Sequence, residues 1–182
     1  MTQVFTSRPD ANFSVVRNFF GQMRDLTKLI DYIIPYPDDR EHRDGFSNDQ
    51  IIDGLNANEK DQVENLLLDK LQARPNDLLI VETLGYMKSK KSLDRLYDLL
   101  EEEKREGSKI IIASSIYKIE PNEKLVDIAL SAGQTLTNWW DLTSIFYYFA
   151  KFKNKRTDDF VRQYFDHKDY LVSYNAKRNV GQ

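Results

Sequence analysis

The sequence has no cysteine in its 182 residues, and it has few histidines and glycines, which many catalytic and ligand-binding sites require. The absence of cysteine excludes disulfide bonds, thiolate catalysis and cysteine-ligated zinc, and is typical of proteins in a reducing compartment. There are only two histidines and seven glycines, and no Gly-x-x-x-x-Gly-Lys segment to hold nucleotide phosphates. The composition therefore predicts a protein that is not an enzyme and that uses no cofactor or metal.

Long apolar runs and an excess of one charge are missing as well. The chain carries 26 basic and 29 acidic residues, a net charge of −3, so no global charge attracts it to nucleic acid or anionic lipid. Charged residues such as Arg17, Arg24 and Asp31 interrupt its most apolar-looking region, which rules that region out as a membrane span. The first nine residues do not resemble a signal peptide. We expect a cytoplasmic protein that does not bind membranes.

What the chain does contain is an apolar pattern that repeats about every 32 residues. Charged positions follow the repeat less closely, as the column Lys88, Glu120 and Lys153 shows. Stacked helical hairpins have this property, because each unit buries a fixed apolar stripe while its exposed face varies. The apolar columns are Ile80, Ile112 and Ile145; Val81, Ala113 and Phe146; Leu84, Ile116 and Phe149; Met87, Ile119 and Phe152; Leu96, Ile128 and Val161; and Leu100, Ala132 and Phe165.

The same pattern predicts the organisation of the chain. Apolar residues spaced by three and four indicate a first helix over residues 12–34, which Pro35 and Pro37 end. This helix and a charged loop form an N-terminal capping region, 1–46, and the repeats occupy 47–182. Their expected bounds are about 47–75, 76–107, 108–136 and 137–168, with a half-repeat at 169–182. No segment alternates as a β-strand would.

Capping residues in the sequence predict where the individual helices begin and end. Ser47 with Gln50, and Asn56 with Glu59, have the spacing of capping boxes. Gly107 and Gly133 are the expected ends of two helices. The further predicted helix starts are Asn76, Ser92, Ser108, Thr137 or Asn138, Thr157 and Asp169.

Two segments resemble HEAT-like repeats of the phycobilin-lyase type. One is the Leu84-Gly85 pair, followed by a polar turn over 88–92 and a leucine-rich helix; the other is Asp166 with Val172 and Ala176, although Ser173 replaces the arginine usual after that valine. The resemblance implies an all-α fold, a right-handed α-solenoid of short helical hairpins. It also implies a scaffold that binds other proteins.

A weaker, local resemblance concerns Trp139-Trp140-Asp141, which is similar to a segment of HEAT-like DNA glycosylases that excise alkylated purines. In those enzymes an aspartate three positions further on stabilises the developing sugar cation. Ser144 occupies that position here and supplies no negative charge, so the resemblance implies a degenerate catalytic site. The acidic balance also argues against nucleic acid as the partner. The other interpretation is that both tryptophans are core or interface residues at a helix start.

The expected interaction surface is the concave side of the solenoid, which the second helix of each hairpin would line. Equivalent positions on stacked helices lie about 10 Å apart, so they form an extended strip for a protein or peptide partner. Trp139 and Trp140 are possible aromatic anchors. The strip contains Arg95, Asp98 and Glu102, then Lys124 and Asp127, then Arg162 and Gln163.

The sequence thus predicts a non-enzymatic protein-binding scaffold, and it leaves the kind of partner open. The partner of a compact acidic helical protein can be a toxin that it neutralises, as in bacterial immunity proteins. The sequence is also compatible with a homodimer and with a DNA-binding, base-excision protein. It leaves open as well whether the C-terminal aromatics are core or interface residues: Tyr147, Tyr148, Tyr164, Tyr170 and Tyr174.

Overall fold

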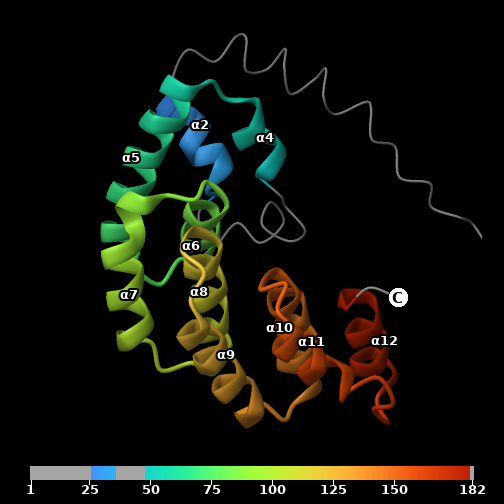
Figure 1. Ribbon diagram of the computed structural model, residues 1–182. Helices are drawn as coiled ribbons and strands as arrows, with labels where there is room; N and C mark the ends of the chain where they lie inside the picture. Colours follow the sequence, from blue (N-terminus) through green and yellow to red (C-terminus); the bar gives the residue numbers. More distant parts are fainter. Residues whose placement is uncertain (1–25, 36–47, 181–182) are drawn as a thin grey trace, which may run out of the picture. The chain divides into compact units, whose positions relative to one another are not determined.

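The computed structural model describes residues 26–35 and 48–180, and within them every regular element is helical (Figure 1). This confirms the all-α prediction for the described part of the chain. None of the described helices is long and apolar enough to cross a membrane. The helices are α2 (Leu26–Ile33), α4 (Asp49–Gly54), α5 (Ala57–Ala73), α6 (Leu78–Tyr86), α7 (Leu93–Glu102), α8 (Glu106–Ile119), α9 (Glu123–Thr135), α10 (Trp139–Lys151), α11 (Lys155–Arg162) and α12 (Tyr170–Asn179), with a 3-10 turn, η1 (Lys90–Ser92).

The chain divides into two compact units, Met1–Leu67 and Leu68–Gln182. In the first unit, α2 corresponds to the end of the helix predicted over 12–34; the rest of that helix and the charged loop lie outside the described residues. Ile30 and Ile33 on α2 are buried, as are Ile51 and Ile52 on α4. The capping box predicted at the start of α5 is confirmed, because the Glu59 carboxylate accepts the Asn56 backbone N–H at 2.8 Å and the Asn56 side chain accepts the Glu59 backbone N–H at 3.0 Å.

The second unit consists of two sets of helices that alternate along the chain. We call α6, α8, α10 and α12 the first helices, and α7, α9 and α11 the second helices. Among the first helices, α6 packs on α8, α8 on α10 and α10 on α12, so a continuous series of neighbours runs through the unit. The second helices pack mainly on first helices, α7 and α9 both on α8 and α11 on α10. The core therefore follows the first helices.

The repeated apolar columns form this core. The three columns that begin with Ile80, Val81 and Leu84 are no more than 2% exposed in any copy. The later columns are less uniform, because Met87, Ile119, Ile128 and Phe165 are only half-buried. The repeat predicted from the sequence thus identifies the helix faces that pack, most closely on the first helices.

The turns after α6 and α10 share a local structure. Lys88 and Lys153, which occupy one repeat column, both have left-handed backbone, with φ of 55° and 48°. Ser92 and Thr157 also match: each is buried and donates its hydroxyl to a backbone carbonyl three residues earlier, at 2.8 Å. The middle copy differs, because Glu120 is extended, with φ of −139°, before Pro121. The two outer copies thus have the more similar turns.

Several predicted helix ends are wrong by one to four residues. Asp77, not Asn76, caps α6, and Asn154, not Thr157, caps α11. The caps at Asn138 and Asp169 are confirmed. Gly107 and Gly133 do not end helices; they lie inside α8 and α9.

Glu103 explains why one helix ends before Gly107. Its carboxylate accepts the backbone N–H groups of Lys104 and Arg105, both at 2.9 Å, and pairs with the Arg105 guanidinium at 3.0 Å. These bonds satisfy backbone donors at the chain reversal, so α7 stops at Glu102 and α8 begins at Glu106 without a glycine. The Arg105 contact and the two backbone donors lower the pKa of Glu103 to about 2.

Two interior glycines mark close approaches. A Cβ on Gly85 would lie 2.8 Å from the Ser115 Cβ and 2.9 Å from its Cα, so a side chain there would push α6 away from α8. A Cβ on Gly133 would lie 2.8 Å from the Phe149 ring. Both glycines permit packing that any larger residue would disturb.

Replacement of Gly85 by alanine should lower the free energy of unfolding by about 1–3 kcal/mol, because α6 and α8 would have to separate. Gly107→Ala is the matched control, since a Cβ on Gly107 would meet no atom within 4 Å, and it should be neutral or stabilising by up to about 1 kcal/mol. Chemical denaturation of both variants measures the difference. Equal effects would contradict the close approach.

The Glu103 contacts should make stability depend on pH. A carboxyl with a pKa lowered from 4.5 to about 2 stabilises the folded state above pH 4.5, and this contribution is lost as the pH falls from 4.5 toward 2. The side-chain carbon of Glu103, followed by NMR, should titrate near pH 2. Arg105→Ala should move that titration upward, and an unchanged midpoint would contradict the assignment.

Candidate interaction surface

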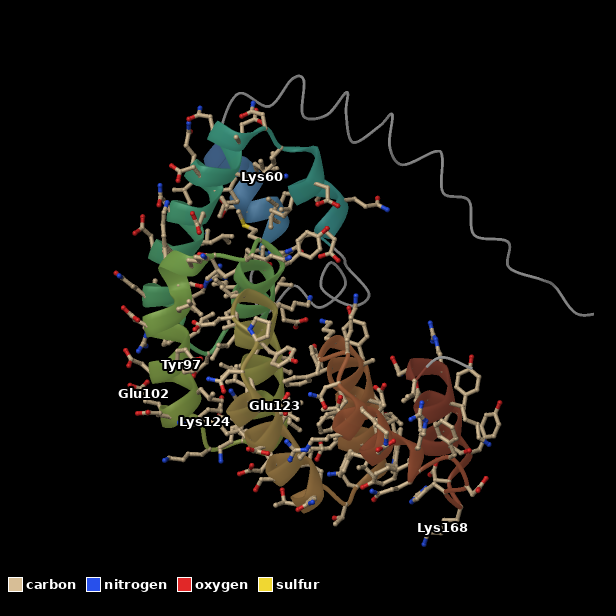
Figure 2. The ribbon with its side chains drawn as sticks, viewed as in Figure 1. Lys60, Tyr97, Glu102, Glu123, Lys124 and Lys168 are labelled. Carbon is tan, nitrogen blue, oxygen red and sulfur yellow. The ribbon has the colours of Figure 1, made fainter. Side chains whose placement is uncertain are left out.

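The residues predicted to form a charged strip are distributed over three second helices. Arg95, Asp98 and Glu102 lie on α7, Lys124 and Asp127 on α9, and Arg162 ends α11 with Gln163 directly after it. All are exposed except Arg95, which is half-buried. Figure 2 shows the side chains of Glu102 and Lys124 at the surface of their helices.

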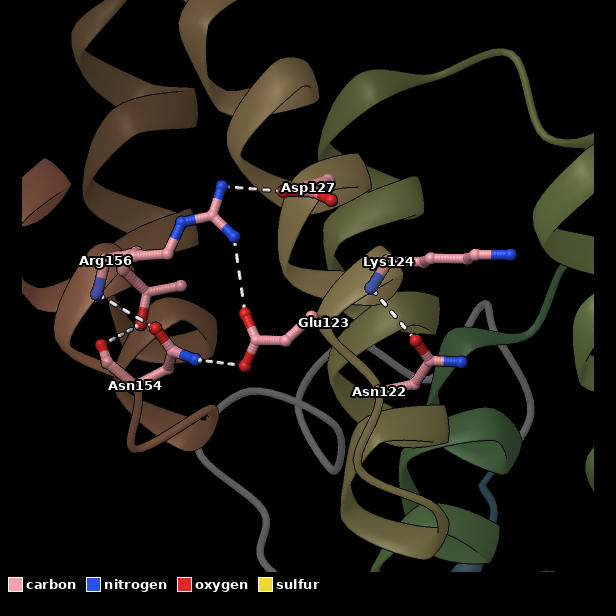
Figure 3. Close-up of polar contacts among 7 residues, drawn as sticks. Asn122, Glu123, Lys124, Asp127, Asn154 and Arg156 are labelled. Carbon is pink, nitrogen blue, oxygen red and sulfur yellow. Dashed lines mark hydrogen bonds and ion pairs between the residues drawn. The ribbon is translucent and has the colours of Figure 1, made fainter.

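Much of the charge on these residues is already paired within the unit. Arg156 donates to Asp127 at 2.6 Å and to Glu123 at 3.3 Å, and Glu123 also accepts from the Asn154 amide at 3.0 Å (Figure 3). These bonds join the start of α9 to the start of α11. They also raise the pKa of the Arg156 guanidinium, chiefly through its hydrogen bond to Asp127.

Arg156 is not among the site residues predicted from the sequence, although the repeat contains a clue to it. In the repeat alignment Lys91, Glu123 and Arg156 share one column, five residues before Leu96, Ile128 and Val161. Equivalent positions on neighbouring units lie close together, so opposite charges in one column predict an ion pair between units. The Glu123–Arg156 contact, at 3.3 Å, is such a pair.

Other residues of the strip have partners on their own helices. Arg162 pairs with Asp159 at 3.2 Å, and Lys155 also pairs with Asp159. Arg95 and Glu102 are 3.8 Å apart at their closest charged atoms. In the described part of the chain Asp98 and Lys124 form no ion pair. The strip is therefore less free to meet a partner's charges than its sequence suggests.

The two tryptophans lie at the start of α10 and are not core residues. Trp139 is 45% exposed and Trp140 66% exposed, and their rings meet edge to face with centroids 5.2 Å apart. Asn138 caps the helix by accepting the Asp141 backbone N–H at 2.9 Å, and its amide donates to the Asp141 carboxylate. The cap holds the helix start, so both indoles are displayed on an ordered backbone.

The exposed side of α10 continues beyond the tryptophans. Trp140, Ser144 and Tyr147 are all exposed and are spaced by four and three residues, which places them on one face. The opposite side carries Phe146 and Phe149, both completely buried. This helix therefore has an apolar face in the core and an aromatic face toward solvent.

The structure shows for each C-terminal aromatic residue whether its side chain is buried or exposed. Tyr147, Tyr170 and Tyr174 are exposed, whereas Tyr148 and Tyr164 are half-buried. Burial raises the pKa of both half-buried phenols. Of the large apolar side chains exposed in the described residues, all but Tyr32 lie on α10 or α12: Trp139, Trp140, Tyr147, Tyr170, Leu171 and Tyr174.

A polar cluster joins α6 to α10 across the intervening helix α8. The Tyr148 hydroxyl donates to Glu82 at 2.9 Å, and the Lys151 ammonium donates to the other carboxylate oxygen at 3.1 Å. That ammonium also lies 4.0 Å from the centre of the Tyr147 ring. Packed helices are about 8–10 Å apart, so long side chains are needed to connect two helices that a third one separates. Glu82, Tyr148 and Lys151 therefore reach past α8 to meet.

Comparisons with known proteins add no further assignment. No protein-family model matches the chain, and neither a curated protein nor a solved structure shows significant similarity to it. The resemblances to HEAT-like repeats and to the glycosylase segment therefore stay predictions. Among the described residues, no group of three or more His, Asp or Glu side chains is placed to hold a metal ion.

Tyr148→Phe should lower the free energy of unfolding by about 1–2 kcal/mol, because the charged Glu82 carboxylate loses a donor. In a Glu82→Ala background the same substitution should cost less than about 0.5 kcal/mol, since the acceptor is gone. Tyr97→Phe is the control, because the Tyr97 hydroxyl has no hydrogen-bond partner among the described residues. Additive effects of Tyr148→Phe and Glu82→Ala in denaturant would contradict a coupled pair.

Proposed function

We propose that this chain is a non-enzymatic, cytoplasmic scaffold that binds a protein partner. Its architecture would be a short right-handed α-solenoid of HEAT-like hairpins. The continuous packing of α6, α8, α10 and α12 supports such a stack, as do the matching turns after α6 and α10. Helical stacks of this kind offer extended surfaces, which suit recognition of another macromolecule better than a small molecule.

The sequence pattern led us to expect the second helices on the concave side of this proposed stack, and we now assign that side to the first helices instead. The Glu82 contacts with Tyr148 and Lys151 favour this side, because they bring together two helices that α8 separates. Ser114, in the same column as Glu82 and Tyr147, is small and 1% exposed. A small residue on the middle helix permits the longer side chains on either side to meet above it.

The observation that carries the proposal is the exposed aromatic face of α10. Tryptophan and tyrosine are the residues most enriched among the energetically dominant contacts of protein interfaces. Exposure of 45%, 66% and 52% for Trp139, Trp140 and Tyr147 leaves a large apolar area in water. Contiguous apolar area of this kind typically marks an interaction site. We therefore assign the two tryptophans the role of anchors in a partner's pockets.

The charged strip on the second helices would have a secondary role. Since Asp127, Arg162 and Arg95 have partners within the unit, a binding protein would have to compete for them. Charges at the edge of an interface change the association rate and orientation more than the affinity. Lys124 and Asp98 are the strip residues best placed to steer a partner.

Affinity capture from source-cell lysate tests this function, with the full chain as bait and quantitative mass spectrometry as the readout. The wild type should enrich at least one protein reproducibly. Trp139→Ala/Trp140→Ala should reduce that enrichment at least about tenfold, the size of effect that loss of an interface anchor produces. Arg95→Glu/Lys124→Glu/Arg162→Glu should reduce it less.

Helical circular dichroism of each bait must match the wild type, which separates loss of binding from loss of folding. Nuclease treatment of the lysate distinguishes a protein partner from one held through nucleic acid. Equal enrichment by the wild type and the tryptophan variant would overturn the anchor assignment. Enrichment that disappears with nuclease would favour nucleic-acid binding instead.

A further inference from the structure

The exposed face of α12 is the second apolar surface of this unit, and it lies outside the α10 anchors. Tyr170 is 74% exposed, Leu171 45% and Tyr174 49%, and Arg178 is also exposed. The Tyr170 and Tyr174 rings stack with centroids 5.9 Å apart. We refer to Tyr170, Leu171, Tyr174, Lys177 and Arg178 as the α12 stripe.

The spacing of these residues gives the stripe one face and two chemically distinct halves. Steps of three and four residues connect Leu171, Tyr174 and Arg178, and also Tyr170, Tyr174 and Lys177, so all five lie along one side of the helix. Val172 and Ala176, which are completely buried, occupy the other side. The N-terminal half of the stripe is aromatic and apolar, and the C-terminal half is cationic.

An antiparallel copy of the same helix complements this arrangement. If Tyr174 lies on a two-fold axis, Tyr170 of one chain faces Arg178 of the other, and Leu171 faces Lys177. A guanidinium over a tyrosine ring is a favourable cation–π contact, and the aliphatic stem of a lysine covers a leucine well. The two tyrosines on the axis would meet each other. Every residue of the stripe then has a suitable partner.

We propose that α12 is the contact surface of a symmetric homodimer, in which the α12 stripes of two copies pair antiparallel. A two-fold interface is self-complementary, so each favourable contact occurs twice. The charges exclude the parallel arrangement, because Lys177 and Arg178 would then face the same cations in the other copy. The Lys177–Asp166 distance of 4.0 Å leaves the ammonium only loosely held within its own chain.

The dimer should be weak and reversible. A helix of ten residues is about 15 Å long, and one such helix per subunit provides less contact area than a stable interface requires. We therefore expect association that depends on concentration. Sedimentation velocity of the wild type up to about 1 mM covers the range of weak affinities.

Two substitutions and their mixture test the pairing directly. Arg178→Glu removes the cation that faces Tyr170, and Tyr170→Arg places one cation opposite another. Each variant alone should weaken the dimer at least about tenfold, because the change acts twice across the axis. An equimolar mixture should restore association, since Arg at 170 of one chain then faces Glu at 178 of the other, while the second pair stays as in the wild type.

Lys90→Glu is the charge-matched control, because Lys90 is exposed on the turn between α6 and α7, and it should dimerise as the wild type does. A wild type that remains monomeric at about 1 mM would overturn the proposal. Failure of the mixture to restore a dimer that both variants weaken would also overturn it. Neither result affects the proposed function, since that is tested with substitutions on α10.

Discussion

The close packing of α6, α8 and α10 is the constraint on which the rest of the second unit depends. Gly85 allows α6 to approach Ser115 on α8 so closely that a methyl group would not fit. On the far side of α8, the buried rings of Phe146 and Phe149 fix which face of α10 meets the core. Because α10 is held by that face, its opposite face must present Trp140 and Tyr147 to solvent. The exposed aromatic surface is therefore a consequence of the packing.

On the surface of this unit, several charged side chains already have polar partners within the unit, whereas the exposed aromatic side chains have no hydrogen-bond partner in the described part of the chain. Arg156 uses its guanidinium to join α9 and α11, and Glu82 uses both carboxylate oxygens to join α6 and α10. These side chains connect elements of the same unit and have little bonding capacity left for a partner. The exposed aromatic rings of α10 and α12 form no hydrogen bond within the described residues, and removing their area from water would stabilise a complex. In the proposed function, apolar contact would therefore contribute more to binding than charge would.

The sequence predicted the helical class and the buried columns because apolar periodicity follows directly from helix geometry. The columns of Ile80 and Leu84 were found in this way. Helix ends were harder to predict from the sequence. Gly107 resembles a helix terminator, but local hydrogen bonds of Glu103 reverse the chain four residues earlier. For the candidate surface, the sequence singled out the tryptophans as possible anchors but left their exposure open. It could not show that Asp127 pairs with Arg156, because that contact depends on the distance between two helices.

Native-state hydrogen exchange tests the central claim, that the first helices form one cooperatively packed core. Amides in the middle of α6, α8 and α10 should exchange most slowly of the second unit. Their exchange should require the same free energy, equal to that of unfolding the unit, because none of these helices can open without exposing the apolar side of its neighbour. The Gly85→Ala variant should lower this free energy equally in all three. Exchange of α10 at a much lower free energy than α6 and α8, or a Gly85→Ala effect confined to α6, would contradict the account.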